Sequence, residues 1–346
     1  MRWLFGATAI LAAAALAGFV IHLPYYTLSP GGTLPLAQRV QVKGAATYPR
    51  RGDFRLLYVR ERPNVNVWQW LQASLDPDID LVKRSDVTGG QPQPLVNLED
   101  QWDMASAKLF AQKVALQAAG FTVRPLDGVS VFGLVPGEPA SKVLQPNDVV
   151  VQADGRPLRN AVDLTRVIGA HHAGQKVRLG IVRKGKPRNV DVPVVIDKGR
   201  PVIGILTMPR YHFPVSVNID TTGISGPSAG LAMTLAVLDR LTPGDLTGGK
   251  RVAVTGTISP DGRVGEIGAI DQKAVTARRA GAKVFLVPSC SDPNYRAQRS
   301  SCEKDLRTVA SRAGKGVKVI PVANVDDALR ALRAAGGDPV SVHPIS

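Results

Sequence analysis

The stretch that most constrains this chain covers residues 220–230, with the sequence D-T-T-G-I-S-G-P-S-A-G, followed by the mainly apolar segment 231–240. Apolar side chains surround nearly the whole circumference of the second part, which predicts a buried helix. Pro227 suits the first turn of that helix, where its missing N–H group costs nothing. Free backbone N–H groups are therefore expected around Ser228.

Ser228 has two interpretations. It can be a capping residue that only starts the helix. It can also be a nucleophile, since the N–H groups of Gly226, Ser228 and Ala229 at the positive end of the helix dipole would stabilise a developing oxyanion. A nucleophilic serine also needs a base.

A lysine further along the chain can supply that base. Residues 252–256 predict a strand and turn, and residues 269–281 predict a helix closed by glycine. Lys273 lies early in this helix, close to the apolar Ile270 and Val275. Apolar surroundings lower the pKa of a lysine by desolvation, so Lys273 is a candidate general base.

Several motifs in this part of the chain occur in a characteristic order: G-P-S-A-G at 226–230, T-G-x-I at 255–258, G-x-V at 262–264, I-G at 267–268 and K-A-x-x-A-x-x-A-G at 273–281. Together they resemble the proteolytic domain of Lon-type serine proteases over roughly residues 201–335. The resemblance implies an α/β (α+β) fold, Ser228 as nucleophile and Lys273 as general base. It also implies that Thr255 is a hydroxyl neighbour orienting the lysine, and that the chain forms a ring-shaped homo-oligomer.

Two positions depart from the Lon pattern. Many Lon enzymes have an acidic residue three positions before the serine, where this chain has Ser225. Many also have glutamate after T-G, where this chain has Thr257. Both departures concern the substrate pocket and leave the serine–lysine pair in place.

Residues 126–198 have a different character. Short strands and turns alternate, with G-x-P-A at 137–140 and N-D-V-V-x-x-x-D-G at 147–155. This order resembles a PDZ domain of the kind found with bacterial proteases, and implies a mainly β domain. PDZ domains bind an extended peptide or a C-terminus by strand addition. The receiving strand would be 129–134 and the facing helix 161–168, which gives the groove residues Val129, Ser130, Val131, Leu164 and Ile168. The alternative is a small structural β domain without a ligand.

The N-terminus is almost continuously apolar over residues 3–23. About 20 such residues can span a bilayer, which predicts a transmembrane signal anchor over 1–24. Arg2 favours an N-terminus inside and a body outside, on the extracytoplasmic side of the cell membrane. Tyr25 and Tyr26 would then lie at the outer membrane interface. A cleavable signal peptide is the alternative, because residues 15–17 fit a small-residue cleavage site.

The remaining segments complete the predicted organisation. Residues 38–125 contain strands and a helix over 103–120, with a loop expected over 76–98. We expect them to pack with residues 200–336 as one protease domain, with the PDZ domain inserted between the two parts. Residues 337–346 are expected to be a tail.

Charge and motif content indicate which kinds of partner and cofactor to expect. Lys and Arg number 43 against 28 acidic residues, giving a net charge of +15, which suits an anionic partner such as a lipid surface. No nucleic-acid-binding motif is present, so nucleic acid is not expected. The histidines lack metal-ligand spacing, and Lys250 is followed by Arg251 where a phosphate-binding loop needs Ser or Thr. No metal, cofactor or ATPase module is therefore expected.

Cys290 and Cys302 are the only two cysteines. Outside a membrane such a pair is typical of a disulfide. This bond would stiffen the polar loop between the two residues.

These features predict a membrane-anchored, ATP-independent serine endopeptidase whose PDZ domain recruits peptide or protein substrates. One alternative is an α/β-hydrolase, since G-x-S-x-G at 226–230 fits a nucleophile elbow. It requires a downstream histidine, and only His343 follows the serine. The other alternative is a non-catalytic PDZ tether or adaptor with a vestigial protease fold.

Overall fold

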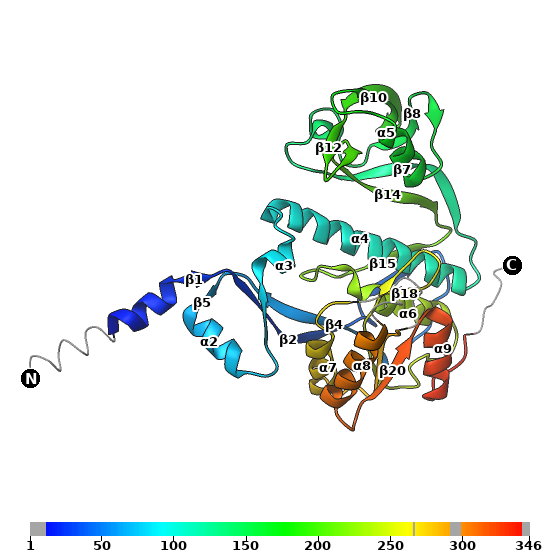
Figure 1. The fold of residues 1–346 in the computed structure, drawn as a ribbon. Helices are drawn as coiled ribbons and strands as arrows, with labels where there is room; N and C mark the ends of the chain where they lie inside the picture. The colour runs from blue at the N-terminus through cyan, green and yellow to red at the C-terminus, as the bar shows by residue number, and fades with distance from the viewer. Residues whose placement is uncertain (1–11, 266, 291–298, 341–346) are drawn as a thin grey trace, which may run out of the picture.

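This computed structural model describes residues 12–265, 267–290 and 299–340. The chain forms a larger and a smaller body, and a six-stranded sheet lies at the centre of the larger one (Figure 1). Four neighbouring strands are parallel, and the other two are antiparallel. In spatial order the strands are β20 (Lys318–Val322), β19 (Val284–Pro288), β16 (Arg251–Val254), β4 (Asp53–Arg62), β2 (Tyr25–Pro35) and β6 (Asp80–Lys83). Strand β4, from the N-terminal part of the chain, thus lies between C-terminal β16 and N-terminal β2.

Helices and short strands cover this sheet. The helices are α2 (Val67–Leu75), α3 (Arg84–Thr88), α4 (Gln93–Ala118), α6 (Gly230–Leu241), α7 (Ile270–Arg279), α8 (Arg299–Ala313) and α9 (Val325–Ala334). The short strands are β1 (His22–Leu23), β3 (Val40–Lys43), β5 (Val65–Asn66), β15 (Ser216–Ile219), β17 (Thr257–Ile258) and β18 (Val264–Gly265). Helix α6 is almost wholly buried and packs against α4, so residues 36–123 and 215–332 share one apolar core.

A second sheet with its own core forms the smaller body. Its strands follow the order β11 (Lys186–Pro193), β10 (Lys176–Arg183), β8 (Val149–Ala153), β7 (Arg124–Leu134) and β14 (Ile205–His212). The accompanying elements are η1 (Pro139–Lys142), α5 (Ala161–Gly169), β9 (Arg156–Pro157), β12 (Val195–Asp197) and β13 (Arg200–Val202). Strand β14 pairs with β7 from Ile205 to His212. The smaller body therefore continues past the sequence-based boundary at residue 198.

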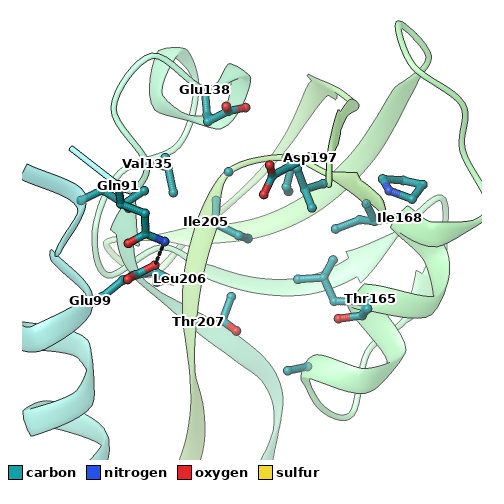
Figure 2. Close-up of a pocket in the computed structure, with 17 residues that line it drawn as sticks. Gln91, Glu99, Val135, Glu138, Thr165, Ile168, Asp197, Ile205, Leu206 and Thr207 are labelled. Atoms are coloured by element: carbon teal, nitrogen blue, oxygen red, sulfur yellow. Dashed lines mark hydrogen bonds between the residues drawn. The ribbon is translucent and has the colours of Figure 1, made fainter. Parts of the chain in front are cut away.

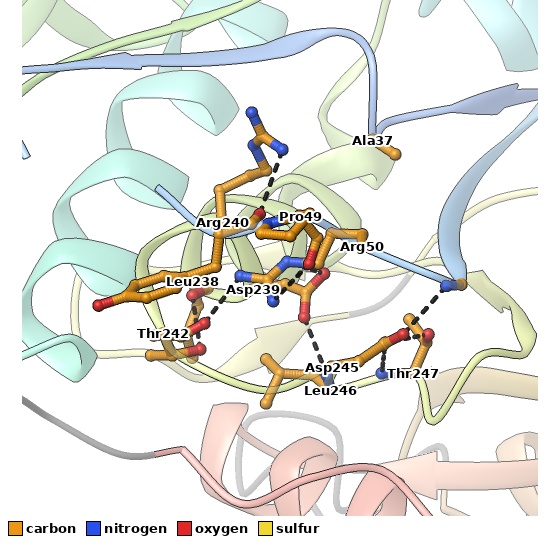
Figure 3. Close-up of polar contacts among 12 residues, drawn as sticks. Ala37, Pro49, Arg50, Leu238, Asp239, Arg240, Thr242, Asp245, Leu246 and Thr247 are labelled. Atoms are coloured by element: carbon orange, nitrogen blue, oxygen red, sulfur yellow. Dashed lines mark hydrogen bonds and ion pairs between the residues drawn. The ribbon is translucent and has the colours of Figure 1, made fainter. Parts of the chain in front are cut away.

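A buried polar network ties the N-terminal part of the chain to the end of α6 (Figure 3). Arg50 Nε lies 2.9 Å from Asp239 Oδ2, with side chains 3% and 6% exposed. Asp245 accepts hydrogen bonds from the backbone N–H groups of Arg51 and Gly52, both at 3.1 Å. Burial raises the pKa of Asp239 to about 6, while the charge of Arg50 acts in the opposite direction. This network holds residues 50–52 against the helix that begins just after Ser228.

Three local predictions were wrong. Helix α4 begins at Gln93, ten residues before the expected start, because Pro94 is accommodated in its first turn. The expected loop over 76–98 contains β6 and α3. The sequence S-P-G-G at residues 29–32 predicts a turn, but these residues lie inside β2, where the pairing with β4 shifts register between Pro30 and Thr33. A Cβ atom on Gly31 would lie 2.2 Å from the Tyr58 carbonyl oxygen, so glycine permits this close approach.

The two ends of the chain differ from expectation as well. Residues 1–11 of the predicted anchor lie outside the described residues, and the helix over 12–20 gives way to β1, which pairs with β5. Across the described ranges, none of the helices combines the length and the apolar character needed to cross a membrane. Tyr25 and Tyr26 belong to β2, and Tyr26 is only 5% exposed.

The expected tail is anchored where it begins. The Asp338 carboxylate accepts a hydrogen bond from the backbone N–H of Asp245 at 2.8 Å. Residues 341–346 lie outside the described residues.

Candidate active site

The backbone around Ser228 is fixed by the end of β16. Ser228 lies in a 3₁₀ turn, η2 (Pro227–Ala229), that leads directly into α6. Gly226 before it has φ +88°, a conformation that favours glycine. The carbonyl oxygen of Ser228 accepts hydrogen bonds from the N–H of Gly256 at 2.9 Å and from the Thr255 hydroxyl at 3.4 Å.

Lys273 reaches the same point from the first turn of α7. Its Nζ donates a hydrogen bond to Ser228 Oγ at 2.9 Å, and the residue is 2% exposed. Burial lowers the pKa of Lys273 to about 8, and the negative charge of Glu61 partly opposes this shift. With that pKa, about one tenth of the amine is neutral at pH 7. The two residues singled out in the sequence are thus in direct contact.

Thr255 lies beside the serine. It is fully buried, and its hydroxyl donates a hydrogen bond to the Ser228 carbonyl oxygen at 3.4 Å. Residues after β16 therefore hold the serine backbone, whereas the lysine position is set by burial in α7. The predicted role of Thr255 in orienting the lysine stays a prediction.

A cleft of about 650 Å³ opens in front of the serine and lysine. Gly226, Ser228 and Ala229 all line it. The N–H groups of a first helical turn have no acceptor within the helix, so those of Ser228 and Ala229 are available to a ligand. An oxyanion formed next to Ser228 Oγ would lie close to these donors.

Two carboxylates in the cleft were missed by sequence reasoning. Glu61 comes from the end of β4 and Asp100 from α4, and both line the cleft with Lys273. Desolvation raises the pKa of Glu61, and the charge of Asp100 raises it further. Desolvation also raises the pKa of Asp100, with Glu99 adding to the effect. Both carboxylates lie more than 100 positions before the serine motif, so no local pattern indicated them.

A second hollow, of about 300 Å³, lies beside α5 in the smaller body (Figure 2). Leu164 and Ile168 of α5 line it, as predicted, together with residues 203–207 at the start of β14. The predicted receiving strand was wrong. Val129 and Val131 are fully buried in the core, and β7 already pairs with β8 at Val129 and Ser130 and with β14 along its length. Strand β14 is the outer strand of this sheet, so its edge faces the groove.

The larger body supplies one wall of this groove. Gln91, just before α4, lines the groove together with Leu95 and Glu99 of the first two turns of α4, and Gln91 Nε2 donates to Glu99 Oε1 at 3.3 Å (Figure 2). The charged residues among the lining are all acidic: Glu99, Glu138 and Asp197. Sequence reasoning missed this wall because residues 76–98 were expected to form a loop.

Cys290 and Cys302 form a disulfide with their Cα atoms 5.7 Å apart. His343, which an α/β-hydrolase would require, lies outside the described residues. Within the described ranges, no group of three or more His, Cys, Asp or Glu residues is arranged to hold a metal ion.

Two family models match the chain. Residues 96–194 match the PDZ domain, and residues 211–334 match the Lon protease (S16) C-terminal proteolytic domain. The chain carries a Lon-type proteolytic domain and a PDZ domain. These matches support a serine peptidase.

Individual relatives match only in part. A Lon protease of Azospirillum brasilense is 36% identical over 116 residues, which is 34% of this chain and 13% of the relative. A Lon protease of Neorickettsia sennetsu is 33% identical over 121 residues, which is 35% of this chain and 13% of the relative. The solved PDZ domain of an SdrC-like protein from Listeria monocytogenes is 28% identical with a TM-score of 0.23, and the match covers 24% of this chain and 88% of that one. The chain therefore spans about an eighth of the length of these Lon relatives.

Proposed function

We propose that this protein is an ATP-independent serine endopeptidase in which Ser228 is the nucleophile and Lys273 the general base. One observation carries the proposal: Lys273 Nζ is 2.9 Å from Ser228 Oγ and almost wholly removed from water. A buried amine with a pKa of about 8 can be neutral under physiological conditions, and only the neutral amine can accept a proton.

The reaction follows from this pair. As Ser228 Oγ bonds to the carbonyl carbon of a substrate peptide, its proton passes to Lys273 Nζ. Negative charge develops on the carbonyl oxygen, next to the N–H groups of Ser228 and Ala229, with Gly226 as a further donor. The protonated lysine then gives its proton to the leaving amine. In the second half, Lys273 deprotonates a water molecule that hydrolyses the acyl-enzyme.

The groove between β14 and α5 would recruit substrates in this proposal. An extended segment of a peptide or protein can add to the open edge of β14 and place apolar side chains against Leu164 and Ile168. The likeness to Lon proteases supports a ring-shaped homo-oligomer.

The same proposal includes the predicted domain division and location. In the predicted division, residues 38–125 and 200–336 form one protease domain with the PDZ domain between them. The shared apolar core of residues 36–123 and 215–332 supports this proposal, with β14 (Ile205–His212) assigned to the smaller sheet. The apolar N-terminal segment anchors the chain in the cell membrane, with its body on the extracytoplasmic side. A disulfide suits that oxidising location.

Active-site labelling tests this function. The full chain is incubated with a fluorescent fluorophosphonate and, separately, with fluorescein-labelled casein. We expect Ser228 to be labelled and the casein to be cut, with both signals lost in Ser228→Ala. An intact, folded chain that shows neither signal would instead be a PDZ tether.

A further inference from the structure

Helix α2 carries an apolar face that the rest of the described chain leaves largely exposed. Trp68, Leu71 and Leu75 are 39%, 43% and 78% exposed. At 3.6 residues per turn, these positions lie within about 60° of one another on one side of the helix. Ala73, on the opposite side, is 4% exposed and packs inward. The exposed face is therefore distinct from the side that attaches α2 to the body.

This face adjoins the N-terminal helix over residues 12–20. The indole N–H of Trp68 donates to the carbonyl oxygen of Ala15 at 2.9 Å, and the rings of Trp68 and Phe19 lie 6.2 Å apart. Next to these contacts, β1 pairs with β5, which directly precedes α2. Figure 1 shows the two helices beside this strand pair, where they project from the larger body. The two helices thus form one continuous surface element.

The N-terminal helix extends the apolar surface. Leu16, Phe19 and Val20 are 68%, 61% and 75% exposed. Neither α2 nor residues 12–20 contain a charged side chain. Adjoining exposed apolar side chains of this kind mark an interaction site, because water solvates them poorly.

A lipid surface suits this element better than a soluble protein does. The helix over residues 12–20, which forms part of this apolar surface, lies within the segment 1–24 that is predicted to enter the membrane. Trp68 has an apolar ring and one polar N–H, a combination enriched at the membrane–water interface. Helices with an apolar face lie in the plane of that interface, with the face buried about 5–10 Å into the boundary between headgroups and acyl chains.

We propose that α2 lies in the headgroup region of a lipid bilayer, with Trp68, Leu71 and Leu75 facing the acyl chains. This inference rests on the proposed membrane anchoring, and adds a second contact that restricts how the body can rotate about its anchor. Without it, one apolar segment would leave the body free to tilt.

Fluorescence quenching in lipid vesicles tests the placement of α2. The environment-sensitive dye NBD is attached to Leu71→Cys in the full chain with the Cys290–Cys302 disulfide intact. Val162→Cys is the matched control, because Val162 is an apolar residue of the PDZ domain that is 64% exposed. Both proteins are reconstituted in phosphatidylcholine–phosphatidylglycerol vesicles with doxyl groups at known depths. We expect dye at position 71 to be quenched severalfold more than dye at position 162, most strongly by shallow doxyl groups.

Three other outcomes would overturn the inference in different ways. If the chain floats with vesicles but dye is quenched equally at both positions, the chain is anchored in the membrane and α2 lies outside the lipid. A chain that does not float with vesicles refutes both the anchor and the α2 contact. Shielding of position 71 that requires two copies in one nanodisc would assign this face to a second copy of the chain.

Discussion

The catalytic cleft and the peptide groove are built in different ways. Residues of the cleft come from β2, β4, α4, η2, β17, α7 and loops between these elements, and its acidic and basic groups range from Arg60 to Lys273 along the chain. Most of the groove comes from residues 135–207, and only one wall comes from α4. The cleft therefore depends on distant segments being folded together, whereas the groove depends mainly on one local fold. A single change should consequently have larger effects at the cleft.

The largest effect is expected when the distant segments are separated. A fragment of residues 200–346 lacks β4, which pairs directly with β16 in the central sheet. It also lacks α4, which packs against α6. We expect no cooperative thermal transition by circular dichroism. A fragment that unfolds cooperatively and cleaves casein at the full-chain rate would show that the cleft is locally encoded after all.

Replacement of either member of the serine–lysine pair should have the next largest effect, which is a loss of catalytic turnover. Arginine stays protonated, so Lys273→Arg should lower turnover at least about a hundredfold, as loss of a general base does. Ser228→Ala should have a comparable effect, and the double variant should be no worse than either single variant because the two groups act as a unit. Initial rates on a peptide substrate measure this. Substantial activity in Lys273→Arg would place the base elsewhere.

The pH dependence of the reaction rate should follow the deprotonation of the Lys273 amine. Because the pKa of Lys273 is lowered to about 8, the rate should rise about tenfold per pH unit below that value and level off above it. The charge of Glu61 raises the pKa of Lys273, so Glu61→Gln should shift the profile to lower pH. Hydrolysis of a small ester between pH 6 and 10 measures both. A profile that Glu61→Gln leaves unmoved would mean that this carboxylate does not act on the base.

The same lysine links pH to stability. Between about pH 8 and 10.5 the unfolded lysine binds a proton that the folded lysine has lost. The free energy of unfolding should therefore increase with pH across this window, by up to about 3 kcal/mol from this group. Urea unfolding of wild type and Lys273→Met would isolate the contribution. Equal slopes for the two proteins would contradict it.

A change in the groove should affect binding alone. Leu164 is 3% exposed and belongs to the core, so a charge there would unfold the domain. Thr165 is exposed and lines the groove, which makes Thr165→Arg the better probe. We expect it to weaken capture of a long peptide while small-ester hydrolysis stays at the wild-type rate. Equal loss of both activities would mean that groove and cleft are not separable.

The smallest effect concerns charge preference in the groove. Among its lining residues Glu99 and Glu138 are acidic, and within the described ranges no cationic side chain forms an ion pair with either. Glu99→Gln and Glu138→Gln should each weaken binding of a lysine-containing peptide about threefold, the order expected for an exposed ion pair. Asp191→Asn, on the far edge of the same sheet, is the matched control. Fluorescence anisotropy with peptides that carry Lys, Gln or Glu measures this binding. Equal affinity for the three peptides would contradict a role for the two carboxylates.

The sequence predicted what is encoded locally. Ser228 and Lys273 belong to ordered motifs within one segment, and a buried helix was indicated by apolar residues around its circumference. Glu61 and Asp100 carry no local signal, because only the pairing of β4 with β16 and the packing of α4 against α6 bring them to the cleft. The receiving strand was missed for a similar reason. Strand β14 follows β13 along the chain but takes the edge of β7, and this strand order cannot be read from alternation of apolar residues.

The placement of α4 sets a minimum length for a substrate. Glu99 and Asp100 are consecutive residues, yet the first lines the groove and the second lines the cleft. A polypeptide that occupies both hollows at once must pass over this helix, whose diameter with side chains is about 10 Å. At about 3.3 Å per extended residue, the crossing takes about three residues. Helix α4 thus sets a minimum spacing between the substrate residues that bind to the PDZ domain and the substrate peptide bond that is cut.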